Sequence, residues 1–125
     1  MNDKVKLPDF DDMLEVAEEI GLLKTRIALN KANLEKLEAL ITQSATTDPK
    51  FFINEKPPSM TYIKSHYHVL GLNDKTKERL DELKSQISED EGKLKESELL
   101  FEVYRSMIDV WRTQSANQRG AYYEG

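Results

Sequence analysis

Two long seven-residue repeats of apolar residues constrain the fold of this chain more than any other feature. In the first repeat, one seam position is held by Met13, Ile20, Ile27, Leu34 and Ile41, and the other by Val16, Leu23, Asn30 and Leu37. In the second, one position is held by Leu80, Ile87, Leu94, Phe101 and Ile108, and the other by Leu83, Asp90, Ser97, Tyr104 and Trp111. Alternating spacings of three and four residues are typical of a coiled-coil seam, because they keep one face of each helix toward a partner.

The repeats predict an all-α protein, an antiparallel two-helix coiled-coil hairpin with a short structured insert at its tip. The 125 residues suit one helical-hairpin domain over 1–125. Its expected parts are a mobile arm, a first helix, the insert, a second helix and a tail, at residues 1–8, 9–43, 44–73, 74–113 and 114–125. Pro8, followed by acids, marks the first helix start, and Asn73 or Asp74 is expected to cap the second. Gly120 is expected to bound any continuation of the second helix.

The insert is too long for a simple turn, so we expect structure within it. Residues 50–53 favour a short extended segment. From Met60 to Leu70, apolar residues recur at helical spacing, which predicts a short amphipathic helix closed by Gly71. A β-hairpin is the alternative, because this stretch is also rich in tyrosine, threonine and valine.

The register of the hairpin has two solutions. One places Leu23 against Phe101 and Leu34 against Asp90, and the other is shifted by one heptad. In both, the polar seam residues Asn30, Asp90 and Ser97 collect near the middle. Burying such groups unpaired costs about 1–3 kcal/mol each, so we expect them to meet water or one another. These polar seam residues predict either looser packing in the middle of the hairpin or a polar contact that fixes the register of the two helices.

Apolar residues exceed what one seam needs near the chain termini. Residues 99–111 contain nine apolar or aromatic residues among thirteen. A contiguous exposed apolar surface usually marks an interface, so we expect self-association at this end of the hairpin. The candidate interface residues are Leu22, Leu29, Leu100, Val103, Met107, Val110 and Trp111. The alternative is that the insert or the C-terminal tail folds back over them.

Motifs for catalysis are absent from the sequence: there is no P-loop, dinucleotide-binding turn, nucleophile elbow or HExxH. There is no cysteine, and His66 and His68 are the only histidines, which we interpret as surface residues. We therefore predict no enzyme activity, catalytic residue, metal or cofactor. No apolar run is long enough to span a membrane, and residues 1–10 lack a secretory signal. The expected location is cytoplasmic or virion-associated, not secreted.

Charge separates the insert region from the helices. The chain has a net charge of −5, which argues against non-specific duplex DNA binding. Residues 60–79, however, carry four bases and two acids, with tyrosine interleaved. Rings that stack on bases beside cations that meet phosphates are typical of single-strand binding. The candidate contacts are Tyr62, Lys64, His66, Tyr67, Lys75, Lys77 and Arg79. The alternative is that the rings pack the hairpin cap, with lysine stems lying around them.

The layout also resembles a known family. A long first helix is followed by Glu55-Lys56-Pro57, a segment with lysine and tyrosine, and a long second helix that ends near Tyr104, Asp109 and Arg119. This plan is similar to the recombination mediators of T4-type phages, which load recombinase onto single-stranded DNA as ring-shaped oligomers. The resemblance implies a phage origin, a homo-oligomer and single-stranded nucleic acid as a partner.

Three functions follow as hypotheses. The first is a non-enzymatic, oligomeric coiled-coil assembly or adaptor protein whose partners are further copies of itself and another protein. The second is an accessory protein of recombination that binds single-stranded nucleic acid. The third is an acidic inhibitor that mimics nucleic acid, which the small size and net charge suit.

Overall fold

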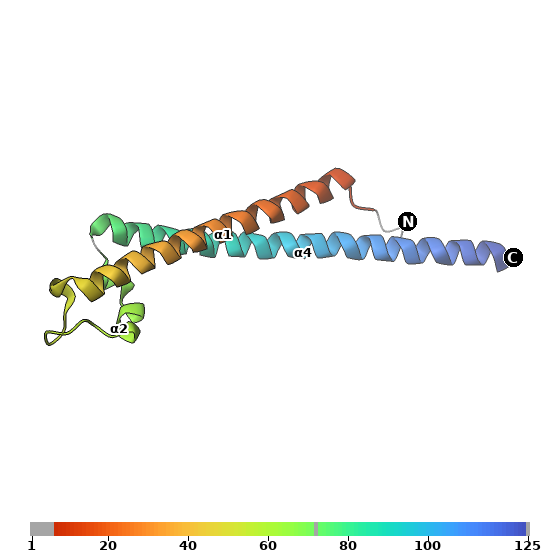
Figure 1. The fold of residues 1–125 in the computed structure, drawn as a ribbon. Coiled ribbons are helices and arrows are strands. Elements are labelled where there is room, and N and C mark those ends of the chain that lie inside the picture. Colours follow the sequence, from red (N-terminus) through yellow and green to blue (C-terminus); the bar gives the residue numbers. More distant parts are fainter. Residues whose placement is uncertain (1–6, 72, 125) are drawn as a thin grey trace. The chain divides into compact units, whose positions relative to one another are not determined.

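The fold is taken from a computed structural model, which describes residues 7–71 and 73–124, with side chains to residue 118. Two long helices, α1 (Phe10–Thr47) and α4 (Asp74–Glu124), pack against each other in opposite directions (Figure 1). Between them lie a 3₁₀ turn, η1 (Pro49–Phe51), and two short helices, α2 (Met60–Ser65) and α3 (Tyr67–Leu70). The described residues contain no strand beyond an isolated bridge between Ile53 and Lys56. The predicted all-α hairpin is therefore confirmed.

Both long helices begin at a side-chain cap. The Asp11 amide donates to Asp9 Oδ1 over 2.9 Å, so α1 begins one residue later than predicted. The Thr76 amide donates to Asn73 Oδ1, also over 2.9 Å, which confirms Asn73 as the cap of α4. Each bond satisfies an amide that has no partner within the first helical turn. The predicted mobile arm, 1–8, lies for the most part outside the described residues.

Both long helices end later than predicted. α1 continues past residue 43 to Thr47, and the Thr46 and Thr47 hydroxyls bond to carbonyls of the preceding turn. α4 runs to Glu124, so the prediction that it ends near Thr113 and is followed by a tail is wrong. No proline follows residue 113, and a glycine such as Gly120 costs an α-helix only about 1 kcal/mol relative to alanine.

The described residues form two compact units, each containing a part of α1 and a part of α4. Unit 1 comprises residues 7–24 and 92–124, and unit 2 comprises residues 25–91. Unit 2 holds a buried cluster to which both long helices and the insert contribute. Its members are Ile41, Ala45, Ile63, Leu70 and Leu80, with Leu34, Leu37, Phe51, Tyr62 and Tyr67 packed against them. The insert thus closes the core of unit 2; the single domain over 1–125 stays a prediction.

The insert is helical where its apolar spacing predicted a helix, and the β-hairpin alternative does not form. The Ser59 hydroxyl caps α2, and the helix is interrupted at His66, where φ is −129°. The prediction that residues 50–53 are extended is wrong for Lys50 and Phe51, which belong to the 3₁₀ turn η1. The turn forms because the Asp48 side chain accepts the Lys50 amide and because proline suits a first turn. The chain then reverses at Asn54 and Glu55, which both have positive φ.

The ion pair between Arg26 and Asp90 indicates the register of unit 2. Arg26 contacts Asp90, and Lys31 contacts Glu91 at 3.0 Å. Asp90 therefore lies level with Arg26, whereas the first register placed it beside Leu34, eight residues further along α1. At 1.5 Å per residue that is a displacement of about 12 Å. The register shifted by one heptad is the one that forms.

Candidate functional site

The seam of unit 1 is less completely covered than that of unit 2. In unit 2, seam residues such as Ile41, Leu80 and Leu83 are buried. Among the described side chains of unit 1, Leu23 is the one buried hydrophobic residue. Seam residues such as Ile20 and Phe101 are only partly buried. A helix pair alone does not bury these side chains, so this part of the chain presents apolar surface.

The part of α4 in unit 1 carries its charges on one narrow side. At 100° per residue, the charged side chains between residues 98 and 112 fall within an arc of about 80°, whereas the nine apolar ones of 99–111 span about 200°. The charged residues are Glu98, Glu102, Arg105, Asp109 and Arg112. One packed partner needs an apolar stripe of about 100°. Packing against α1 accounts for about half of the apolar arc of α4. The other half has no packing partner among the described residues.

Exposure values place the predicted interface residues. Leu22 is 64% exposed, Val103 53%, and Leu100, Val110 and Trp111 each slightly above 40%. All of these lie in unit 1, together with Met107, which is partly buried. Leu29 is exposed but belongs to unit 2, so these units give no basis for grouping it with them. The alternative in which a tail covers this surface is not seen, because residues 114–124 continue α4.

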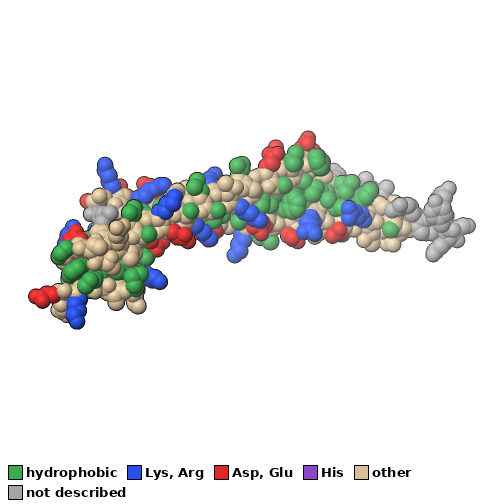
Figure 2. All heavy atoms as spheres, in the orientation of Figure 1, with side chains coloured by type: hydrophobic (Ala, Val, Ile, Leu, Met, Phe, Trp, Pro, Cys, Tyr) green, Lys and Arg blue, Asp and Glu red, His purple; other side chains and the backbone are tan. Residues whose placement is uncertain are grey.

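Exposed leucines of unit 1 that were not among the predicted interface residues include Leu99 and Leu14. Leu99 is 65% exposed, and Leu14 is 46% exposed. Leu99 lies beside Val103 and Val110 on the side of α4 away from the seam, since residues four and eleven apart share a face. We call these three residues the outer edge of α4. Figure 2 shows hydrophobic side chains gathered on one face of unit 1. A full helical-wheel count of the sequence would have found Leu99.

α4 also extends beyond the start of α1. Ala17 and Ile20 line a groove with Glu98 and Phe101, so residue pairs of unit 1 that sum to about 118 lie level. On that register Phe10, the first residue of α1, is level with about residue 108. α4 continues for about 20 Å beyond Trp111, at 1.5 Å per residue. A helix of this length that packs against nothing is marginal in water, so a further partner would stabilise this part of α4.

The residues predicted to contact nucleic acid all lie in unit 2. Their aromatic rings and their cationic side chains have different surroundings there. Tyr62 stacks on His66, with ring centroids 4.0 Å apart, and both tyrosines pack against the buried cluster. The Tyr67 hydroxyl lies 3.5 Å from the Thr42 hydroxyl. These rings are used in packing, as the alternative interpretation expected. The cations Lys64, Lys75 and Arg79 are exposed, Arg79 lies 3.4 Å from Glu82, and Lys77 is partly buried.

Other polar clusters serve the fold. Nε2 of His68 lies 3.2 Å from Asp81, and His66 Nδ1 lies 2.8 Å from the Tyr62 carbonyl oxygen. Over the described ranges, no group of three potential metal-binding side chains comes together. Asp90, the one buried charged side chain described, is bound by Arg26 and Gln86. Asp90 thus acts as a neutralised seam residue, as a register lock requires.

None of the described helices is both long and apolar enough to cross a membrane.

The apolar face of unit 1 is the best-supported candidate site, because its exposed side chains exceed what packing against α1 needs. No family model matches the chain, and no curated protein or solved structure does so either.

Proposed function

We propose that the protein is a non-enzymatic coiled-coil assembly or adaptor protein that binds further copies of itself through the outer edge of α4. The observation that carries this proposal is the apolar arc on α4, about twice as wide as one partner helix needs. Leu99, Val103 and Val110 are exposed on it. Exposed apolar surface of this extent costs free energy in water and is stabilised by association.

Self-association suits the outer edge because few charges lie beside it. Ser106 and Thr113, between Val103, Val110 and the charged arc of α4, are neutral, and the two charges one turn before Leu99, Lys95 and Glu96, have opposite signs. Two copies that pack outer edge to outer edge in antiparallel directions therefore do not place these like charges opposite one another. A two-fold contact of this kind uses the same patch on both subunits. Burying a leucine or valine side chain fully contributes about 1.5–3 kcal/mol, so three from each copy support a stable contact.

The double substitution Val103→Glu with Val110→Glu tests the proposal. We expect the wild type to have an oligomeric mass in light scattering, and the variant a lower mass with unchanged helicity by circular dichroism. The matched control is Arg105→Gln with Arg112→Gln, which makes the same change of net charge on the charged arc of α4. This control should keep the wild-type mass.

A wild type that is monomeric throughout the micromolar range would remove the self-association proposal. Equal loss of mass in both double variants would show that net charge, and not the outer edge, controls the oligomer.

A further inference from the structure

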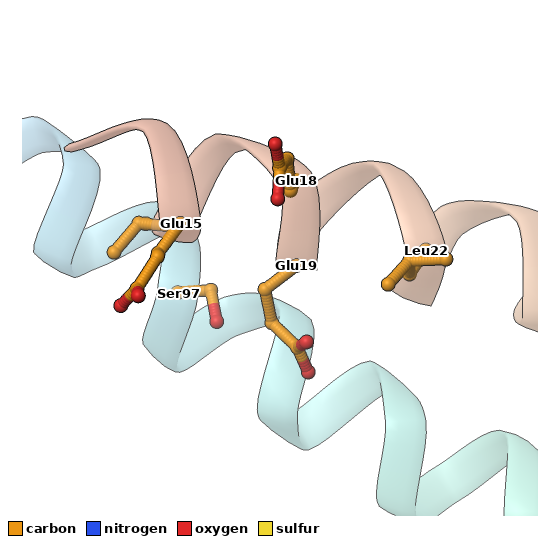
Figure 3. A pocket seen from close by; sticks show the side chains of 6 residues that line it. Glu15, Glu18, Glu19, Leu22 and Ser97 are labelled. Atoms are coloured by element: carbon orange, nitrogen blue, oxygen red, sulfur yellow. The ribbon is translucent and has the colours of Figure 1, made fainter. Parts of the chain in front are cut away.

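Unit 1 contains an open groove between α1 and α4 that differs from the outer edge in chemistry. It has a volume of about 430 Å³ and is lined by Glu15, Val16, Glu18, Glu19, Leu22 and Ser97. Glu15 and Glu19 extend from α1 toward α4, with Ser97 between them, and Glu18 points away (Figure 3). We call this the acidic groove.

The two walls of the acidic groove are unlike. In unit 1, the described α1 side, residues 7–24, carries six acids and one base, a net charge of −5. The α4 side, residues 92–118, carries four acids and four bases. Ser97 is the α4 residue that lines the groove, and Lys93 lies one turn before it. Leu100 follows Ser97 by three residues and Met107 follows Leu100 by seven, so both continue the groove on the same side of α4. The α1 wall is therefore anionic, and the α4 wall is apolar on the side of Ser97 that runs toward Leu100 and Met107.

We infer that the acidic groove binds an amphipathic helix of a partner protein, one whose apolar stripe is bordered on one side by lysine or arginine. The groove runs between two antiparallel helices, which is the seat a third helix takes in a bundle. Val16, Leu22 and Leu100 would meet the apolar stripe of that helix. Glu15 and Glu19 would meet its basic border. This inference rests on the proposed assembly role of unit 1 and specifies the partner.

Charge argues against nucleic acid and against one arrangement of a second copy. A second copy that laid its own hairpin over the groove in antiparallel fashion would bring the acids of its α1 against those of the first, and like charges repel. Nucleic acid would bring phosphates to the same carboxylates. The outer edge lies about 70° further round α4 than Leu100 and Met107, at 100° per residue. Self-association there leaves the acidic groove open, so one assembly can use both surfaces.

Binding of a synthetic peptide to the full chain tests this inference. The probe is a fluorescently labelled three-heptad helix with leucine at the seam positions and lysine along one border of the stripe. We expect saturable binding in fluorescence anisotropy that weakens as salt rises, because the rim charges are exposed and screened. A peptide of the same composition with scattered leucines and lysines should bind at least about tenfold more weakly, since it lacks the stripe that the apolar wall recognises.

Charge reversal on the protein locates the site. Glu15→Lys with Glu19→Lys should weaken peptide binding about tenfold, from the usual size of exposed ion pairs. The matched control, Glu98→Lys with Glu102→Lys, makes the same charge change on the opposite groove of unit 1 and should bind the peptide nearly as well as the wild type. If charge reversal disturbs the fold in circular dichroism, Glu15→Gln with Glu19→Gln gives the same ordering with a smaller loss.

The outcomes separate the two proposals. No binding by the lysine-bordered peptide, equal binding of the scattered peptide, or equal weakening by the control variant would each overturn the acidic-groove inference. The Val103→Glu, Val110→Glu variant should lose mass and keep peptide binding. A wild type that is monomeric yet binds the peptide at Glu15 and Glu19 would end the self-association proposal and leave this inference standing.

Discussion

Removing the Arg26 side chain tests whether the seam tolerates Asp90 because its charge is neutralised. Asp90 has no exposed surface. Arg26 donates from Nε to Asp90 Oδ2 over 3.0 Å and from Nη2 to Oδ1 over 2.6 Å. Gln86 adds a third bond, 3.1 Å long, to Oδ1. Two-point contacts between guanidinium and carboxylate are among the strongest polar interactions in proteins, so this pair dominates the polar layer of unit 2.

The expected cost of Arg26→Met follows from the burial of the two partners. Leaving a buried carboxylate without its cation costs about 3–5 kcal/mol. The Arg26 side chain is half exposed, so water will replace part of the lost interaction. We therefore expect the free energy of unfolding to fall by about 2–3 kcal/mol, between the buried and the exposed limits. Methionine keeps an apolar stem of similar length, which limits the loss of packing.

Asp90→Leu should behave in the opposite way. It removes the buried charge and restores an apolar seam residue, and the Arg26 charge left without its partner is half exposed to water, so we expect stability to stay the same or to rise. Urea unfolding followed by circular dichroism measures both variants, provided that the denaturant slopes match. The reasoning would be refuted if Asp90→Leu lost as much stability as Arg26→Met, or if Arg26→Met changed stability by less than about 0.5 kcal/mol. The first result would assign the pair a net stabilising role, and the second would show that the Asp90 charge is not in need of its partner.

Three further predictions use other positions. Leu23→Asp should unfold unit 1, because the side chain is 1% exposed and a buried unpaired charge costs several kcal/mol, whereas Leu22→Asp, at a 64% exposed neighbour, should keep the circular dichroism and thermal midpoint of the wild type. Gly92→Ala should raise the free energy of unfolding by about 1 kcal/mol, since a Cβ there meets no atom within 4 Å in the helix interior; an unchanged urea midpoint would contradict this. If single-stranded nucleic acid is a ligand, Lys64→Glu with Lys75→Glu should weaken its binding, and a wild type that ignores a labelled oligonucleotide at low salt removes that hypothesis.

Seam residues could be predicted because a single repeat determines them. The heptad positions of α1 match the burial pattern, with Leu23, Ile27 and Ile41 buried and most of their neighbours exposed. The pattern does not determine which turn of α4 lies beside which turn of α1, because a shift of one heptad restores the same facing positions. The register depends on contacts such as Arg26 with Asp90, and Arg26 lies outside the seam. Its role therefore could not be read from the repeat.

Helix ends and the insert were less predictable for a different reason. Glycine was expected to stop α4, yet α4 continues to Glu124, since one glycine is a weak signal without proline or a cap. In the insert, tyrosine spacing was compatible with either a packed or a nucleic-acid-binding role. Packing uses Tyr62 and Tyr67 because the end of the helix pair needs apolar side chains to close the core of unit 2. Local sequence alone does not show that requirement.

The two units differ in how their apolar side chains are covered, and this difference is the physical basis for assigning function to unit 1. Unit 2 has the same two helices plus an insert, and it buries Ile41, Ile63 and Leu80 completely. Unit 1 has no corresponding third element among its described residues, although its stretch of α4 is the more apolar. In unit 2, part of the chain itself packs against the helix pair and completes its core. The insert therefore shows how a third element can complete a pair of these helices, and it supports the proposal that another polypeptide does so in unit 1.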